Sequence, residues 1–113
     1  MTTTSDPLDI LAIFAHPDDA ELLCGGSLIK AMRAGKRVGA LDLTRGEAGS
    51  TGSPELRAEE AGEASEVMGL AARANARLSV AQRVNDHASR VGVATWIREF
   101  RPRIVVTHWR EGR

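Results

Sequence analysis

The chain has 113 residues, of which 42% are hydrophobic and 27% charged, a composition typical of one globular domain or part of one. Fifteen basic residues balance fifteen acidic ones, which excludes the uniformly basic character that drives non-specific nucleic-acid binding. The single cysteine, Cys24, excludes an internal disulfide framework and a cysteine-based zinc cage. No apolar stretch approaches membrane-spanning length, and the first residues lack a signal-peptide pattern. The sequence therefore predicts a cytoplasmic domain with no nucleic-acid or membrane partner.

The first part of the chain alternates strand and helix patterns. Residues 8–15 (LDILAIFA) are rich in branched apolar side chains, which predicts a strand buried on both faces. Residues 20–34 have helical spacing, with Leu22 and Leu23 expected on the buried side. Residues 37–43 (RVGALDL) predict a second strand, and the glycine-rich segment that follows predicts a loop.

The second part continues this alternation. The dipeptide Ser-Pro at residues 53–54 is typical of a helix start, and this helix is expected to run to about Met68. Residues 73–79 are ambiguous between a loop and a short strand. A third helix is expected over residues 80–100, and residues 103–108 (RIVVTH) predict a further buried strand. This order predicts an α/β domain of Rossmann-like, three-layer αβα architecture with a mainly parallel sheet.

Polar residues follow three of the predicted strands. These segments read HPDD at residues 16–19, TRGE at residues 44–47 and THW at residues 107–109. The carboxyl ends of parallel strands meet at one edge of a sheet, and ligands of such domains collect there. The predicted topology therefore places the functional site at this edge.

Four polar residues lie between the first strand and its helix: His16, Asp18, Asp19 and Glu21. One explanation is a capping box, in which Asp18 caps the helix and Glu21 completes the motif. A capping box does not explain His16 or the adjacent, mutually repelling carboxylates. The alternative is that His16 and Asp19 bind a divalent metal such as zinc, while Asp18 takes a proton from the water that the metal activates. These residues alone leave both explanations open.

Two segments together resemble a known family. AHPDDAELLCGG at residues 15–26, followed by DLTRGEAGSTGSPELRAEEA at residues 42–61, is similar to the PIG-L/LmbE family of zinc-dependent N-acetylglucosamine deacetylases. Within that family the chain looks most similar to the bacillithiol-biosynthesis deacetylases, which act on N-acetylglucosaminyl malate. The resemblance implies a hydrolase that removes the N-acetyl group from a small-molecule N-acetylglucosamine conjugate. It also implies Zn²⁺ or ferrous iron as the cofactor, and a homo-oligomer.

The resemblance further implies roles for individual residues. His16 and Asp19 match the family's metal ligands, and Asp18 matches its general base. Arg57 matches an arginine that holds substrate hydroxyls, and Glu47 lies in the loop that borders the sugar pocket. Apart from the resemblance, Arg57 could equally form a surface ion pair with the glutamate three residues further along its helix.

The chain also departs from the family pattern. The family's third metal ligand and the histidine that protonates the leaving amine come from a His-Pro-Asp-His motif, which should begin near Arg113, where the sequence ends. We therefore expect residues 1–113 to form a single but incomplete LmbE-like deacetylase domain. His108 could supply a ligand, although a strand-end histidine is the more ordinary explanation. The competing hypothesis is a truncated, non-catalytic Rossmann-like fragment that binds a sugar or a nucleotide.

Overall fold

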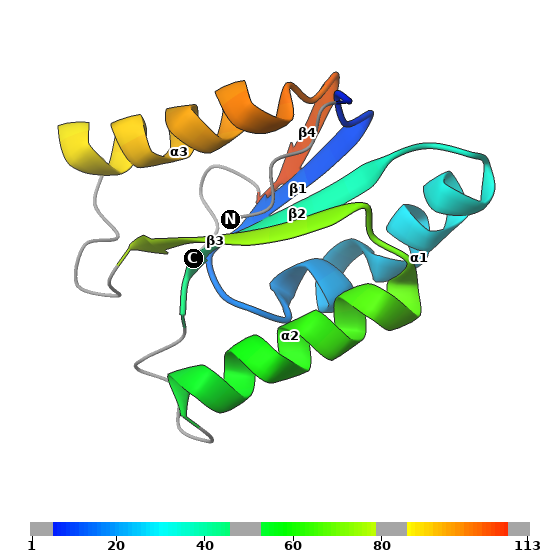
Figure 1. Ribbon diagram of the computed structural model, residues 1–113, viewed down its shortest axis with the longest axis horizontal. Coiled ribbons are helices and arrows are strands. Elements are labelled where there is room, and N and C mark those ends of the chain that lie inside the picture. Colours follow the sequence, from blue (N-terminus) through cyan, green and yellow to red (C-terminus); the bar gives the residue numbers. More distant parts are fainter. Residues whose placement is uncertain (1–5, 46–52, 79–85, 109–113) are drawn as a thin grey trace.

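The computed structural model describes residues 6–45, 53–78 and 86–108, which form a parallel sheet between two layers of helices (Figure 1). In the order β3-β2-β1-β4, the strands are β1 (Ile10–Phe14), β2 (Val38–Thr44), β3 (Ala72–Leu78) and β4 (Ile104–Thr107). The helices are α1 (Asp19–Arg33), α2 (Pro54–Met68) and α3 (His87–Phe100). Helices α1 and α2 cover one face of the sheet, and α3 covers the other (Figure 1). The predicted α/β, Rossmann-like three-layer fold is confirmed.

Strand β1 lies inside the sheet and determines where the strand ends meet. It pairs in parallel with both β2 and β4. The hydroxyl of Thr44 donates to the carbonyl oxygen of Ala15 at 2.9 Å, and the hydroxyl of Thr107 donates to that of Ile13 at 2.6 Å. The carboxyl ends of β1, β2 and β4 are therefore held together at one edge of the sheet.

Apolar side chains are buried on both faces of the sheet. The core on the α3 side consists of Leu8, Leu11, Ile13, Leu41 and Phe100. The core on the side of α1 and α2 consists of Ala12, Phe14, Ala20, Leu28 and Val38. Burial on both faces explains why the segment around β1 is apolar without alternation, as is usual for parallel strands.

Strand β3 is the segment that the sequence left ambiguous. It pairs in parallel with β2. Its alternate residues Ala72, Ala74 and Ala76 pack against the core on the α3 side. Alanine has low strand propensity, so composition alone did not favour a strand here. The alternation of alanine with polar residues is the signal that identifies it.

Helix α3 begins later than expected. Asp86 has an extended backbone (φ −102°, ψ 169°), and its carboxylate accepts the backbone N–H of Ser89 at 2.8 Å. Asp86 is therefore an N-cap, and the helix starts at His87. The predicted start at residue 80 was wrong, and residues 79–85 lie outside the described part of the chain.

The first turns of helix α1 expose two leucines that the sequence pattern placed on the buried side. Leu22 and Leu23 are 78% and 62% exposed, although the spacing placed them on the buried side. The helix is kinked at Cys24, whose backbone is non-helical (φ −145°, ψ 16°), so the residues before the kink do not share the helical phase of those after it. In the described ranges, every helix is too short or too polar to cross a bilayer.

Candidate active site

His16 and Asp19 lie at the carboxyl end of β1, where the chain turns into α1. His16 Nδ1 lies 3.4 Å from Asp19 Oδ2, and the side chains are 34% and 21% exposed. The same carboxylate oxygen accepts the backbone N–H of His16 at 3.0 Å. The turn therefore holds one nitrogen donor and one oxygen donor side by side at the surface.

The spacing of these two donors fits a shared metal ion. Zinc bonds of about 2.1 Å in tetrahedral geometry place two ligand atoms about 3.4 Å apart. A mixed imidazole and carboxylate pair suits zinc and similar divalent metals. Over residues 6–45, 53–78 and 86–108, no three His, Cys, Asp or Glu side chains are grouped as metal ligands. The described residues thus bring together one nitrogen donor and one oxygen donor at a spacing compatible with a shared zinc ion.

His108 follows β4 at the same edge of the sheet. Its Nε2 lies 3.8 Å from Asp19 Oδ2 and accepts the backbone N–H of Ala15 at 3.3 Å. Its ring packs edge-on against Phe14, with centroids 4.7 Å apart. The Nε2 lone pair is therefore already engaged, which favours the ordinary role of a strand-end histidine over that of a metal ligand.

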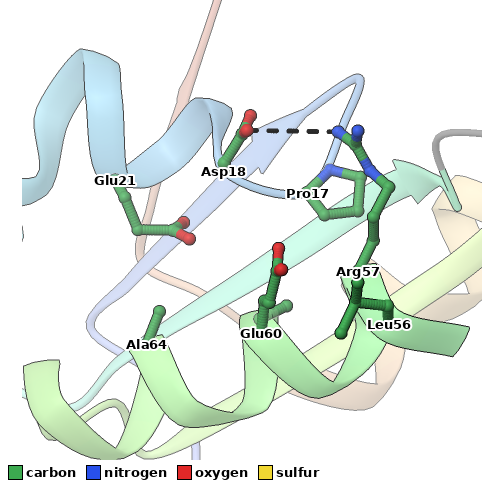
Figure 2. Close-up of a pocket in the computed structure, with 8 residues that line it drawn as sticks. Pro17, Asp18, Glu21, Leu56, Arg57, Glu60 and Ala64 are labelled. Atoms are coloured by element: carbon green, nitrogen blue, oxygen red, sulfur yellow. Dashed lines mark ion pairs between the residues drawn. The ribbon is translucent and has the colours of Figure 1, made fainter. Parts of the chain in front are cut away.

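Asp18 occupies the N-cap position of α1 without forming a capping box. Its backbone is left-handed (φ 91°), and its side chain accepts no capping hydrogen bond. N-cap side chains normally reach the first-turn amides from an extended backbone, so this conformation directs the carboxylate elsewhere. The carboxylate is 60% exposed, and its Oδ2 lies 4.0 Å from Nη2 of Arg57 (Figure 2). The capping-box explanation was wrong.

Arg57 reaches from α2 toward the loop before α1. Its side chain is 19% exposed, and its Nε is buried without a hydrogen-bond partner among the described residues. Its ion pair in the described structure is with Asp18, so the alternative of a surface pair with Glu60 is not what the structure shows. Both Asp18 and Arg57 line a cavity of about 450 Å³. The full lining is Pro17, Asp18, Glu21, Leu56, Arg57, Glu60, Ala61 and Ala64.

A buried ion-pair network, which the sequence analysis missed, lies next to this cavity. Nε and Nη2 of Arg73 donate to the two oxygens of Asp42, each at 2.9 Å, and Nη1 lies 3.0 Å from Oε1 of Glu21. Nη1 also donates to the Ser65 hydroxyl at 3.5 Å. One guanidinium therefore joins β3 to β2, α1 and α2. The available signal was Asp42 itself, a lone acid within an otherwise apolar strand, which needs a buried partner.

Burial raises the pKa of Asp42 from 3.8 to about 6, although the hydrogen bonds and charge of Arg73 act in the opposite direction. Because the pKa of Asp42 is higher in the folded state, protonation of its carboxyl favours folding. This stabilisation is complete below about pH 4 and is lost as the pH rises through about 6. We expect the unfolding free energy of the wild type to fall relative to that of Asp42→Asn between pH 4 and pH 7, by about 2 kcal/mol. Denaturant titrations of both proteins across this range measure the difference, and parallel profiles would contradict it.

Two other residues that the sequence singled out are Glu47 and Cys24. Glu47, which the family resemblance places beside the sugar pocket, lies outside the described residues. Cys24 packs against the core beneath α1, and burial, with a smaller contribution from the charge of Glu21, raises the pKa of its thiol. A raised pKa favours the neutral thiol, which suits a packing role.

The sequence matches one family and several curated proteins. A family model described as PIG-L: GlcNAc-PI de-N-acetylase matches residues 11–113. The 1D-myo-inositol 2-acetamido-2-deoxy-alpha-D-glucopyranoside deacetylase of Segniliparus rotundus is 31% identical, with 90% of this chain and 44% of that protein covered. The chain spans less than half the length of the curated relatives it matches.

The fold matches solved structures over most of the chain. The conserved protein TT1542 from Thermus thermophilus superposes with a TM-score of 0.81 at 45% identity, covering 87% of this chain and 44% of that one. The N,N'-diacetylchitobiose deacetylase from Pyrococcus horikoshii has a TM-score of 0.78 at 23% identity, covering 88% and 40%. At 23% identity the second match establishes a shared fold alone.

The predicted subgroup needs correction. The relatives from Segniliparus rotundus and Nakamurella multipartita, 31% and 38% identical, are both named for an inositol-linked acetamido-glucopyranoside and not for N-acetylglucosaminyl malate. The predicted family is confirmed, because the family model covers nearly the whole chain and the fold agrees. The chain therefore belongs to the PIG-L family, whose family model is described as GlcNAc-PI de-N-acetylase.

Proposed function

We propose that the protein is a metal-dependent hydrolase that removes the N-acetyl group from an N-acetylglucosamine conjugate, with Zn²⁺ or ferrous iron as its cofactor. The observation that carries this proposal is the 3.4 Å approach of His16 Nδ1 to Asp19 Oδ2, next to a cavity lined by Asp18 and Arg57. Membership of the PIG-L family and the names of the curated relatives support the same reaction.

In this proposal His16 and Asp19 hold the metal. When bound, a divalent metal supplies Lewis-acid chemistry, which polarises the acetyl carbonyl and lowers the pKa of water. The exposed carboxylate of Asp18 accepts the proton that the attacking water gives up. Hydrolysis breaks the amide C–N bond, so that the water oxygen ends on acetate, and the nitrogen takes up a proton as it leaves as a free amine.

Arg57 is proposed to bind the sugar hydroxyls. Its guanidinium presents several N–H donors in one plane, and the side chain, which is 19% exposed, lines the cavity. Glu47 is proposed, on the family resemblance alone, to border the same pocket. The substrate would then be a small amino-sugar conjugate, and the inositol-linked substrates named for the relatives are the first to test.

The domain organisation, compartment and oligomeric state follow from the same family resemblance and from the composition. Residues 1–113 belong to one deacetylase domain, which acts in the cytoplasm as a homo-oligomer. The single cysteine in the sequence supports the reducing compartment, and the family resemblance supports the oligomer.

Acetate release tests the proposed function directly. The protein, loaded with Zn²⁺ or Fe²⁺, is incubated with inositol-linked and malate-linked N-acetylglucosamine, and acetate and free amine are quantified. We expect equimolar acetate and amine, loss of activity with a chelator and recovery when metal is restored. Calorimetric binding of a sugar or nucleotide without acetate release would instead favour the non-catalytic binding fragment.

Replacing Arg57 with Lys is expected to raise KM about tenfold while kcat changes by less than about threefold. Lysine retains the positive charge but lacks the planar set of donors, so it weakens ground-state and transition-state binding alike. Steady-state kinetics on the conjugate that the wild type deacetylates measure both constants. Arg33→Lys, an exposed position in the last turn of α1, is the matched control. An unchanged KM for Arg57→Lys would remove Arg57 from the binding site.

A further inference from the structure

The cavity beside Asp18 is also lined by Glu21, whose buried carboxylate oxygen lies against the guanidinium of Arg73. Glu21 extends from α1, and its buried Oε1 lies 3.0 Å from Nη1 of Arg73 as an ion pair, without a hydrogen-bond partner among the described residues. The Glu21 side chain is 22% exposed. Its carboxylate points into the space between α1 and α2, toward the side on which Glu60 projects from α2 (Figure 2). One oxygen of the Glu21 carboxylate therefore faces the Arg73 guanidinium, and the side chain also lines the cavity.

Arg73 cannot move easily to release this carboxylate. Its guanidinium is bound to both oxygens of Asp42, and the Arg73 and Asp42 side chains are 9% and 3% exposed. A bidentate pair fixes the plane of the guanidinium as well as its position. Because Asp42 lies in β2 and Arg73 in β3, the sheet itself orients the Nη1 atom that meets Glu21.

The cavity suits a neutral ligand that donates hydrogen bonds. Asp18, Glu21 and Glu60 each contribute a carboxylate to its lining, and Arg57 contributes a guanidinium. An ionised carboxylate only accepts hydrogen bonds, whereas a sugar hydroxyl both donates and accepts them. A volume of about 450 Å³ lies in the range of small-molecule sites. The lining therefore matches a polyhydroxylated ring better than an anion.

We propose that Glu21 accepts a hydrogen bond from one hydroxyl of the sugar in this cavity, and that Arg73 is the positioning residue that holds the Glu21 carboxylate there. This inference rests on the proposed function, because it requires the amino sugar to occupy the cavity. Glu21 would then determine which hydroxylated rings bind, while Asp18 and the metal ligands act on the acetamide.

Glu21→Gln separates this role from a purely structural one. The positive charge of Arg73 favours the Gln carbonyl oxygen at the position of Oε1, so the amide NH₂ then faces the cavity. A hydroxyl that donated to the carboxylate loses its acceptor, and KM is expected to rise about tenfold with kcat nearly unchanged. A structural defect would instead lower the thermal midpoint and affect every substrate equally.

The experiment compares wild type and Glu21→Gln on the conjugate that the wild type deacetylates and on its 3-, 4- and 6-deoxy sugar analogues. We expect one analogue to give the same KM with both proteins, because it lacks the hydroxyl that Glu21 binds. Arg73→Lys should raise KM for the parent conjugate in the same way, and the double variant should be no worse than the poorer single variant. Glu63→Gln, exposed on α2 and outside the cavity lining, is the control that leaves KM unchanged.

The outcomes distinguish this inference from the function on which it rests. If the wild type releases no acetate from any conjugate, the proposed function fails, and this inference fails with it. If the wild type is active and Glu21→Gln keeps the wild-type KM, or raises KM equally for the parent and all three analogues, the inference alone is overturned. If Glu21→Gln does not fold, the shortened carboxylate of Glu21→Asp takes its place, with the same expected pattern across the analogues.

Discussion

Replacing Asp18 with Asn is expected to lower kcat by about 10²–10⁴-fold while the bound metal stays at its wild-type level. The amide has nearly the same shape as the carboxylate but cannot take the proton of the attacking water. Asp18 is 60% exposed and lies 4.0 Å from Arg57, so loss of this weak surface pair should change the stability of the fold little. Turnover at saturating substrate and metal content by plasma mass spectrometry are the two readouts.

The control for this variant is Glu59→Gln, which removes one exposed carboxylate of α2 that does not line the cavity. Its kcat should equal that of the wild type. Wild-type turnover by Asp18→Asn would show that Asp18 is not the base. Loss of metal in proportion to the loss of turnover would assign Asp18 to the metal ligands instead.

Replacing Asp19 with Asn is expected to cost both metal and activity. The Asn carbonyl oxygen can still accept the backbone N–H of His16, so the turn before α1 should persist. A neutral amide is a much weaker metal ligand than a carboxylate. Loss of a residue that merely supports a ligand weakens metal binding about 10–100-fold, so loss of the ligand should cost at least about 100-fold.

Competition with a chromogenic chelator measures the metal affinity of Asp19→Asn, and circular dichroism confirms that the variant is folded. Asp18→Asn is the matched comparison, because it alters the adjacent carboxylate of the same turn and should retain the metal. Zinc affinity of Asp19→Asn equal to that of the wild type would contradict the assignment of Asp19 as a ligand.

The sequence predicted the parts of the fold that depend on burial and on strong end signals. The apolar runs around β1 and β2 correctly predicted buried parallel strands, and the Ser-Pro pair places the start of α2 correctly. Residues 104–107 do form a parallel strand, β4, but its predicted burial was wrong, because Ile104 and Val105 are 56% and 43% exposed. Helix α2 ends at Met68, as expected, and Gly69 follows it in a left-handed conformation (φ 77°). These features are local, so they can be read from a few consecutive residues.

Features that depend on tertiary contacts were missed or misread. Strand β3 is built from alanine and polar residues, and its hydrogen bonds to β2 override its weak propensity. The kink at Cys24 exposes Leu22 and Leu23, which no helical periodicity anticipates. For β3, pairing with the neighbouring strand decides the outcome and the local pattern does not.

The site was only partly accessible to sequence reasoning for the same reason. The spacing of His16 and Asp19 across a tight turn brings their donors to 3.4 Å, which a three-residue step allows. The role of Arg73 depends on three residues of other elements: Glu21, Asp42 and Ser65. Such a contact becomes visible only when the register of the sheet and the placement of both helices are known.

The most direct measurement is the anomalous scattering of zinc in crystals soaked with the metal. The account predicts a peak about 2.1 Å from both His16 Nδ1 and Asp19 Oδ2, with the Asp18 carboxylate near it but outside the bonding distance. A well-ordered site without a peak, in which the His16 and Asp19 side chains turn away from each other, would contradict it.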